Sequence, residues 1–245
     1  MNLRAAAILL CAPALACAQC KGTLYLTIDT GSMSQAENIA QILRRHEVRA
    51  TFFLANETTV NRDTSLGDAW IPYWKARVAE GHAFGSHTFD HTYWKADLPD
   101  GRVRVRPQFG VNAGKMLQWG EAEVCGELNR VKSWFKAATG ADLAPIWRAP
   151  GGHVSARTLQ WGGACGYTHV AWAAAGFLGD ELPSEKYPND VLLRRALANL
   201  KDGDIMMMHT GIWSRKEPFA PMLDPLIAGL KQKGFCFATL PRART

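Results

Sequence analysis

The sequence lacks the features of membrane, nucleic-acid and repeat proteins. After Leu15, no apolar run approaches the roughly 20 residues that a membrane-spanning helix requires. There is no internal repeat, low-complexity tract or linker, so repeat architectures are excluded. Only six cysteines occur, and none has the spacing of a zinc-cysteine site. What remains is the composition of a globular protein of one domain.

Excess positive charge is small and not concentrated. The chain has 28 Lys and Arg against 22 Asp and Glu, a net charge of +6. The densest basic segment, Arg102–Arg106, alternates Arg with Val and is typical of an exposed edge. We therefore expect no nucleic-acid partner, and we expect a monomer.

Residues 1–18 have the pattern of a secretory signal peptide. A short basic start precedes the apolar stretch Ala5–Leu15, and small residues lead to a cleavage site at Ala18. A lipoprotein signal centred on Cys17 is a weaker alternative. The pattern predicts export to the periplasm or the medium, with 19–245 as a single catalytic domain.

Four cysteines remain after cleavage, and an even number in an exported chain indicates disulfides. Cys20 precedes the first predicted strand, and Cys236 lies in the last. Because the first and last strands of a barrel are neighbours, the favoured pairs are Cys20–Cys236 and Cys125–Cys165.

Short apolar runs alternate with amphipathic segments, which indicates an α/β fold with parallel strands. The expected strands are Thr23–Ile28, Ala50–Ala55, Ala83–Ser86, Ala144–Arg148, Tyr167–Trp172, Asp204–Met208 and Phe235–Leu240. The expected helices are one starting at a capping box, Ser34–Glu37, and those at Trp70–Glu80, Glu121–Thr139, Ser155–Cys165, Asp190–Leu200 and Pro221–Lys233. The segment Tyr93–Leu117 is expected to be a loop at the rim.

Polar residues follow four of these strands: Asp29, His87, Arg148 and His209. The carboxyl ends of parallel barrel strands share one face, where active sites are built. His87 and His91 are four residues apart, and on a helical turn both would face one divalent metal ion. Each residue alone has an ordinary explanation, such as a cap or a packed side chain, so the signal is their joint placement.

The ordered motifs LTIDTG, HTFDH, WRAPGG, HVAW and IMMMHTG resemble those of the polysaccharide deacetylases, carbohydrate esterase family 4. The resemblance implies a distorted (β/α) barrel, usually of seven strands. It implies a hydrolase that removes N- or O-acetyl groups from a carbohydrate polymer or oligomer, with one divalent ion, normally Zn²⁺.

The resemblance also implies residue roles. Asp29 matches the general base, Arg148 the arginine that orients it, and His209 the general acid. His87 and His91 match the metal ligands.

Other matches are looser. Asp180, in GFLGDEL, matches the acidic residue that tunes the catalytic histidine. Trp172, Met207 and Pro150 match substrate-binding positions, although core packing explains Trp172 and Met207 equally well.

Thr30 departs from the family, which has a metal-binding aspartate at this position. A hydroxyl is a much poorer zinc ligand than a carboxylate. An ion could still bind through His87, His91 and another oxygen, with Asp90 or Asp29 nearest. Alternatively, the chain is a metal-independent amidohydrolase of a small C–N substrate, or an inactive carbohydrate-binding homologue. Because every other catalytic match persists, we favour an active deacetylase.

Overall fold

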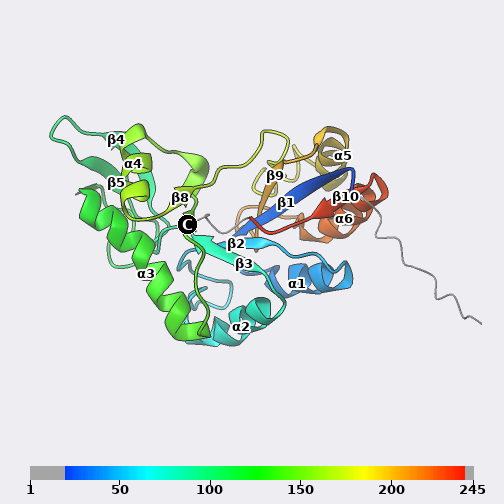
Figure 1. Cartoon of the computed structure of the whole chain (residues 1–245), viewed down its shortest axis with the longest axis horizontal. Coiled ribbons are helices and arrows are strands. Elements are labelled where there is room, and N and C mark those ends of the chain that lie inside the picture. The colour runs from blue at the N-terminus through cyan, green and yellow to red at the C-terminus, as the bar shows by residue number, and fades with distance from the viewer. Residues whose placement is uncertain (1–19, 241–245) are drawn as a thin grey trace, which may run out of the picture.

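The computed structural model describes residues 20–240 (Figure 1), so the predicted signal peptide lies outside the described residues. The strands are β1 (Gly22–Asp29), β2 (Thr51–Leu54), β3 (Ala83–Ser86), β4 (Tyr93–Asp97), β5 (Val103–Arg106), β6 (Leu117–Trp119), β7 (Ile146–Trp147), β8 (Thr168–His169), β9 (Ile205–His209) and β10 (Phe235–Phe237). The helices are α1 (Ala36–Arg45), α2 (Ile71–Ala79), α3 (Glu121–Thr139), α4 (Ala156–Ala164), α5 (Asn189–Asn199) and α6 (Leu223–Gln232), with short 3-10 turns at Asp68–Trp70, Pro150–Gly152 and Ala220–Met222.

Seven strands form one parallel sheet, which confirms the α/β class. Its order is β10-β1-β2-β3-β7-β8, and β9 pairs with the second half of β1. Between β8 and β9 the sheet is not closed by a regular strand. There, the Ala173 N–H donates to the Ile205 carbonyl, and the Met207 N–H donates to the Gly176 carbonyl. An irregular segment thus spans the gap in the barrel.

Strand β1 is buried on both faces, as expected of a strand in a covered parallel sheet. Leu24, Leu26 and Ile28 alternate with Thr27 and Asp29, and all five are at most 2% exposed. Because successive side chains point to opposite faces, the apolar set and the polar pair lie on different sides of the sheet. This alternation places Asp29 in the barrel interior at the carboxyl end of the strand.

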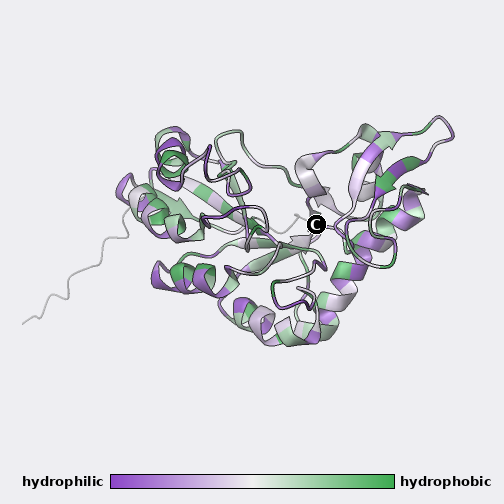
Figure 2. Cartoon of the chain, turned by 180° about the vertical axis from the view of Figure 1, so that it is seen from behind, coloured by the Kyte–Doolittle hydropathy of each residue, from purple (hydrophilic) through white to green (hydrophobic). Residues whose placement is uncertain are grey.

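Helix α1 packs on the sheet with one apolar face. Ile39, Ile42 and Leu43 of α1 recur at helical spacing and are buried. Figure 2 shows the same division, with hydrophilic and hydrophobic residues alternating along the helices. In the part of the chain described, no helix is both long and apolar enough to cross a membrane.

The prediction of a loop at Tyr93–Leu117 was wrong. Strands β4, β5 and β6 form an antiparallel sheet of their own at one end of the molecule, beside α3 and α4 (Figure 1). Val103 and Val105 point inward and are buried, whereas Arg104 and Arg106 are exposed. The strands are short and separated by Gly- and Pro-containing turns, which hid the period-2 pattern.

Two local predictions were also wrong. The Ser34–Glu37 capping box does not form, because the Ser34 hydroxyl hydrogen-bonds Ser32 and helix α1 begins at Ala36 without a side-chain cap. His87 and His91 do not lie on a helical turn. The chain between them turns through left-handed residues, with φ of 59° at Thr88 and 48° at His91. The turn nevertheless brings the two imidazoles close together.

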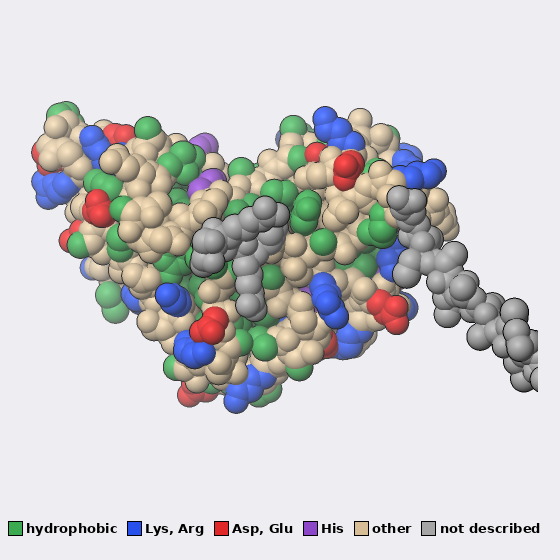
Figure 3. Space-filling view, viewed as in Figure 1, with side chains coloured by type: hydrophobic (Ala, Val, Ile, Leu, Met, Phe, Trp, Pro, Cys, Tyr) green, Lys and Arg blue, Asp and Glu red, His purple; other side chains and the backbone are tan. Residues whose placement is uncertain are grey.

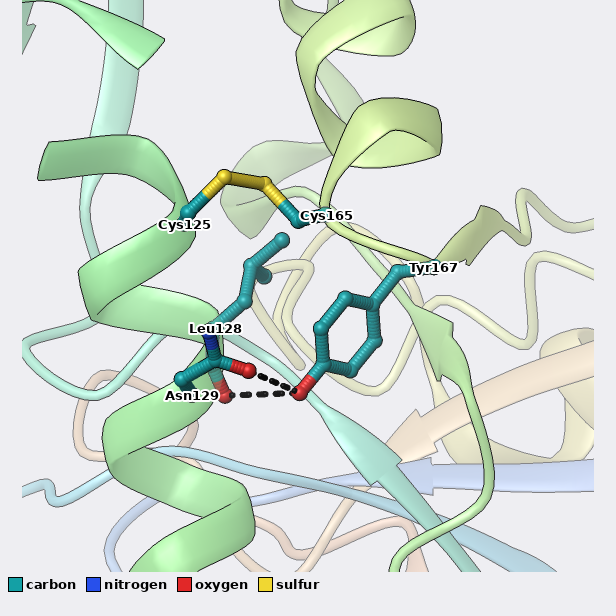
Figure 4. Close-up of a disulfide and its surroundings, with 5 residues drawn as sticks. All are labelled: Cys125, Leu128, Asn129, Cys165 and Tyr167. Atoms are coloured by element: carbon teal, nitrogen blue, oxygen red, sulfur yellow. Dashed lines mark hydrogen bonds between the residues drawn. A yellow bond between two sulfur atoms is a disulfide. The ribbon is translucent and has the colours of Figure 1, made fainter. Parts of the chain in front are cut away.

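Both predicted disulfides are confirmed. Cys20–Cys236 links the start of β1 to β10, and Cys125–Cys165 links α3 to the end of α4. Figure 4 shows that Tyr167 ties the same two segments, since its hydroxyl lies 2.9 Å from Asn129 Oδ1. Two disulfides are consistent with an exported protein.

Removing the Cys125–Cys165 bond in a Cys125→Ser/Cys165→Ser variant should lower the free energy of unfolding by about 2–4 kcal/mol, because a closed loop restricts the unfolded chain. Denaturant unfolding would measure the change. Tyr167→Phe is the control: it keeps the disulfide and loses only the hydroxyl's contacts with Asn129 Oδ1 and the Leu128 carbonyl, so its cost should be about 1 kcal/mol. Equal losses in the two variants would contradict the prediction.

Candidate active site

The ends of adjacent strands bring four distant segments together. Asp29 ends β1 and His209 ends β9, and the two are register partners across the strands. His87 follows β3 and Arg148 follows β7, the next strand in the sheet. All four side chains therefore reach the same rim of the sheet.

Asp29 and Arg148 form a buried ion pair. Arg148 Nη1 lies 2.8 Å from Asp29 Oδ1 and 2.8 Å from Thr27 Oγ1, and the arginine is fully buried. Its guanidinium also stacks 4.2 Å above the Phe53 ring. Burial by itself would raise the pKa of Asp29, but Arg148, with smaller contributions from the nearby imidazoles, holds that pKa below its usual value. Asp29 is thus kept ionised.

His87 is held as a neutral imidazole with one nitrogen directed at Asp29. Its Nδ1 lies 2.9 Å from the Arg148 carbonyl, which requires a proton on Nδ1. Its Nε2 then carries a lone pair and lies 3.7 Å from Asp29 Oδ2. Burial lowers the pKa of His87 to about 3, more than the negative charge of Asp29 raises it.

His91 is the neighbour of His87. The two rings are 4.9 Å apart between centroids, and His91 Nδ1 is buried without a hydrogen-bond partner. The Tyr93 and Phe109 rings contact the other sides of the imidazole.

His209 is paired with Asp180. The backbone N–H of His209 donates to Asp180 Oδ2 over 2.7 Å, and Nδ1 lies 3.2 Å from both carboxylate oxygens. Burial alone would lower the pKa of His209, but Asp180 foremost, then Asp29 and Glu181, raise it to about 10. The imidazole is therefore charged at neutral pH.

The threonine at position 30 and the glycine at position 31 each have a structural role in the loop after β1. The Thr30 hydroxyl accepts the backbone N–H of Ala55 over 2.9 Å, which ties the loop after β1 to the end of β2. A side chain on Gly31 would collide with the Gly211 carbonyl oxygen of the loop after β9. The close approach of these two loops requires glycine.

The donor set fits a divalent ion only at its two imidazoles. His87 offers a lone pair on Nε2, and His91 retains a buried nitrogen with no partner. Asp90, one of the expected oxygen donors, instead pairs with Arg130 at 2.9 Å. Within residues 20–240, no three His, Cys, Asp or Glu side chains are grouped closely enough to hold a metal ion. The carboxylate absent at Thr30 is thus not replaced by an obvious neighbour.

A cavity of about 490 Å³ opens over these groups. Its wall consists of Thr30, Gly31, Ser32, Glu57, His91, Tyr93, Gln108, Phe109, Glu181, Leu182, His209, Gly211, Ile212, Trp213 and Ser214. Three of the predicted site residues line it: Thr30, His91 and His209. Asp29, His87 and Arg148 are not part of this wall and are buried.

The predicted substrate contacts do not line this cavity. Met207 is buried within β9, and Pro150 is buried at the start of a 3-10 turn. Trp172 instead packs near Arg148, with the guanidinium 5.5 Å from its ring. These three residues do not contribute to the cavity wall.

Residues that the motifs did not indicate complete the cavity: Glu57, Tyr93, Glu181 and Trp213. Glu181 directly follows Asp180 in GFLGDEL, whereas Glu57, Tyr93 and Trp213 lie outside the quoted motifs. Closeness to a motif residue was the signal that the sequence offered, for Glu181 beside Asp180 and for Trp213 four residues after His209.

Comparisons with known proteins agree with the motifs. The profile of the family described as polysaccharide deacetylase matches residues 17–170. A chitooligosaccharide deacetylase of Azorhizobium caulinodans is 24% identical, over 91% of this chain and 95% of its own length.

Solved structures share the fold. The Bc1960 peptidoglycan N-acetylglucosamine deacetylase superposes with a TM-score of 0.66 at 22% identity, covering 89% of this chain and 86% of its own. BA3943 of Bacillus anthracis, described as a CE4 family pseudoenzyme, gives a TM-score of 0.65 at 20% identity, covering 90% and 64%.

The family profile spans more than half of the chain, from before β1 to the end of β8. The recognition made from the motifs, and with it the predicted enzyme class of carbohydrate deacetylases, is confirmed at the level of the family. This chain belongs to the polysaccharide deacetylase family.

Proposed function

We propose that this protein hydrolyses acetyl groups, chiefly N-acetyl and also O-acetyl, on a carbohydrate polymer or oligomer. The observation that carries the proposal is a pair of charged contacts, one at Asp29 and one at His209, at the ends of the adjacent strands β1 and β9. Asp29 with Arg148 forms an ionised base, and His209 with Asp180 forms a charged acid. A base and an acid whose environments drive their pKa values in opposite directions are what amide hydrolysis requires.

Asp29 is the general base. Arg148 occupies Oδ1, so Oδ2 is the oxygen that accepts a proton from the attacking water. The water oxygen then bonds to the acetyl carbon, and the carbonyl becomes an oxyanion.

His209 is the general acid. Asp180 holds Nδ1, which leaves the proton on Nε2 to be given to the leaving nitrogen as the C–N bond breaks. The products are acetate and the free amine of the sugar.

His87 and His91 would hold a divalent ion, with Zn²⁺ the expected identity and Thr30 at its edge. The chemistry that such an ion would supply is Lewis-acid polarisation of the acetyl carbonyl. The hydrogen bond from His87 Nδ1 to the Arg148 carbonyl keeps the ring oriented for that role.

An inactive carbohydrate-binding homologue is the second candidate, and Thr30 is the observation that favours it. The resemblance to BA3943 shows that this fold also occurs in a protein described as a pseudoenzyme. Retention of the Asp29, Arg148, His209 and Asp180 contacts supports the active enzyme instead.

Asp29→Asn and His209→Ala should each reduce acetate release from acetylated oligosaccharides by at least about 100-fold, because a positioned base or acid contributes that much. Circular dichroism and thermal unfolding would check that the fold survives, since Asp29→Asn removes the negative charge that pairs with the buried guanidinium of Arg148. Exposed Asp68→Asn is the matched control and should keep full activity. Near wild-type turnover in either variant would contradict the assigned roles.

Thr30→Asp should tighten Zn²⁺ binding by at least about tenfold. Loss of a residue that only hydrogen-bonds a metal ligand already lowers metal affinity by about 10–100-fold, and a direct carboxylate ligand should matter at least as much. Calorimetric titration of the metal-free protein would measure it, without relying on activity. Thr30→Asn has a similar size and no charge, and should leave affinity nearly unchanged. Identical affinity in Thr30→Asp and wild type would mean that position 30 does not face the ion.

Asp180→Asn should return the His209 pKa from about 10 towards 6.5, because burial then acts without the opposing carboxylate. The alkaline decline of kcat should move to lower pH in the same variant, with KM little changed. In wild type, the charged imidazole stabilises the fold fully below pH 6.5, and this stabilisation is lost as pH rises through about 10. NMR titration of His209 would measure the shift, and an unchanged titration would refute the pairing.

A further inference from the structure

Among residues 20–240, those that line the cavity include two carboxylates and neither Lys nor Arg. The carboxylates are Glu57 and Glu181, and the other ionisable lining groups in the described part of the chain are His91, Tyr93 and His209. This contrasts with the chain as a whole, which carries 28 Lys and Arg. Figure 3 shows basic and acidic side chains interspersed over one outer face. The acidity of the cavity is therefore local.

Glu57 is the most unusual group in the wall. It is only 7% exposed, and its Oε1 is buried without a hydrogen-bond partner. Its backbone is fixed on both sides by Ser65, whose hydroxyl accepts the Glu57 N–H over 2.9 Å and whose N–H donates to the Glu57 carbonyl. A buried carboxylate oxygen without a partner is costly unless a cation or donor arrives. Its position thus suits a ligand with positive charge.

Glu181 provides a second carboxylate beside the proposed catalytic acid. Its Oε2 lies 3.9 Å from His209 Nε2. Burial raises the pKa of Glu181, while the charge of His209 opposes that shift. The wall is therefore acidic next to the point where the leaving amine forms.

Aromatic rings accompany the carboxylates. Tyr93 and Phe109 line the cavity around His91, and Trp213 stands at the wall with 62% of its surface exposed. Aromatic faces attract both the apolar face of a sugar ring and a cation. Rings with carboxylates are a suitable surface for a sugar that bears an ammonium group.

A divalent ion is a less suitable partner for Glu57. Along residues 20–240, no His, Cys, Asp or Glu triplet has metal-binding geometry, so Glu57 does not group with His87 and His91. An organic ammonium group, unlike a divalent metal ion, can be held by one or two carboxylate contacts and does not need a close shell of ligands.

We propose that this cavity binds a hexosamine unit with a free ammonium group, placed next to the acetylated unit that is hydrolysed. Glu57 is the main contact and Glu181 the second. The proposal rests on the proposed function and narrows its substrate class to partly deacetylated oligosaccharides. Such a substrate would be supplied by an earlier deacetylation of another sugar unit in the same oligosaccharide.

The test is calorimetric binding of a fully deacetylated glucosamine tetramer, which offers no acetyl group to hydrolyse. It is carried out with the wild-type protein at a pH where the sugar amines are charged. Glu57→Gln should weaken binding about tenfold, since it removes one charge-assisted contact. Glu181→Gln should weaken it less, and added salt should weaken wild-type binding. Exposed Glu121→Gln is the matched control and should bind like wild type.

A second measurement uses acetate release. Wild type should show kcat/KM about tenfold higher for a partly deacetylated tetramer than for the fully acetylated one, and Glu57→Gln should remove that preference. Equal kcat/KM for both tetramers would overturn the inference while leaving the proposed function intact. Loss of Zn²⁺ affinity in Glu57→Gln would also overturn it, by making Glu57 a metal ligand. Absence of acetate release from either tetramer would instead refute the proposed function.

Discussion

The buried contact between Arg148 and Asp29 is the interaction on which the rest of the site depends. A fully buried guanidinium requires a carboxylate partner, and breaking such a pair costs about 3–5 kcal/mol. Arg148 also contacts Thr27 of the same strand as Asp29, and its backbone carbonyl binds the His87 imidazole. One residue therefore connects β1, β3 and β7, ionises the carboxylate and sets the orientation of the histidine.

The same physical rule gives two histidines opposite charge states. Burial of His87 outweighs the opposing charge of Asp29, and the pKa of His87 falls to about 3. His209 is also buried, but Asp180 contacts both its ring and its backbone, and its pKa rises to about 10. A neutral imidazole suits a metal ligand and a charged imidazole suits an acid, and both lie beside the same base in space.

Much of the fold could be predicted because local patterns and parallel-sheet topology agree. The strand at residues 83–86 and the pairing of the first strand with the last followed from apolar runs and turn residues. The sheet β4-β5-β6 could not, because its strands are three to five residues long and only Val103 and Val105 show the alternation. The irregular segment that spans β8 to β9 has no sequence pattern, since its hydrogen bonds go to a strand about 30 residues away.

The order of residues along the chain fixes which chemical groups follow the strands, and it puts a threonine where the family has an aspartate. Strand alternation and the right-handed α/β connections then leave only one rim for Asp29, His87, Arg148 and His209. The protonation states of these groups, the tautomer of His87 and the carboxylates in the cavity wall follow from the packing of the folded chain. Those properties depend on burial and on distances between segments remote in sequence, and no local pattern encodes either.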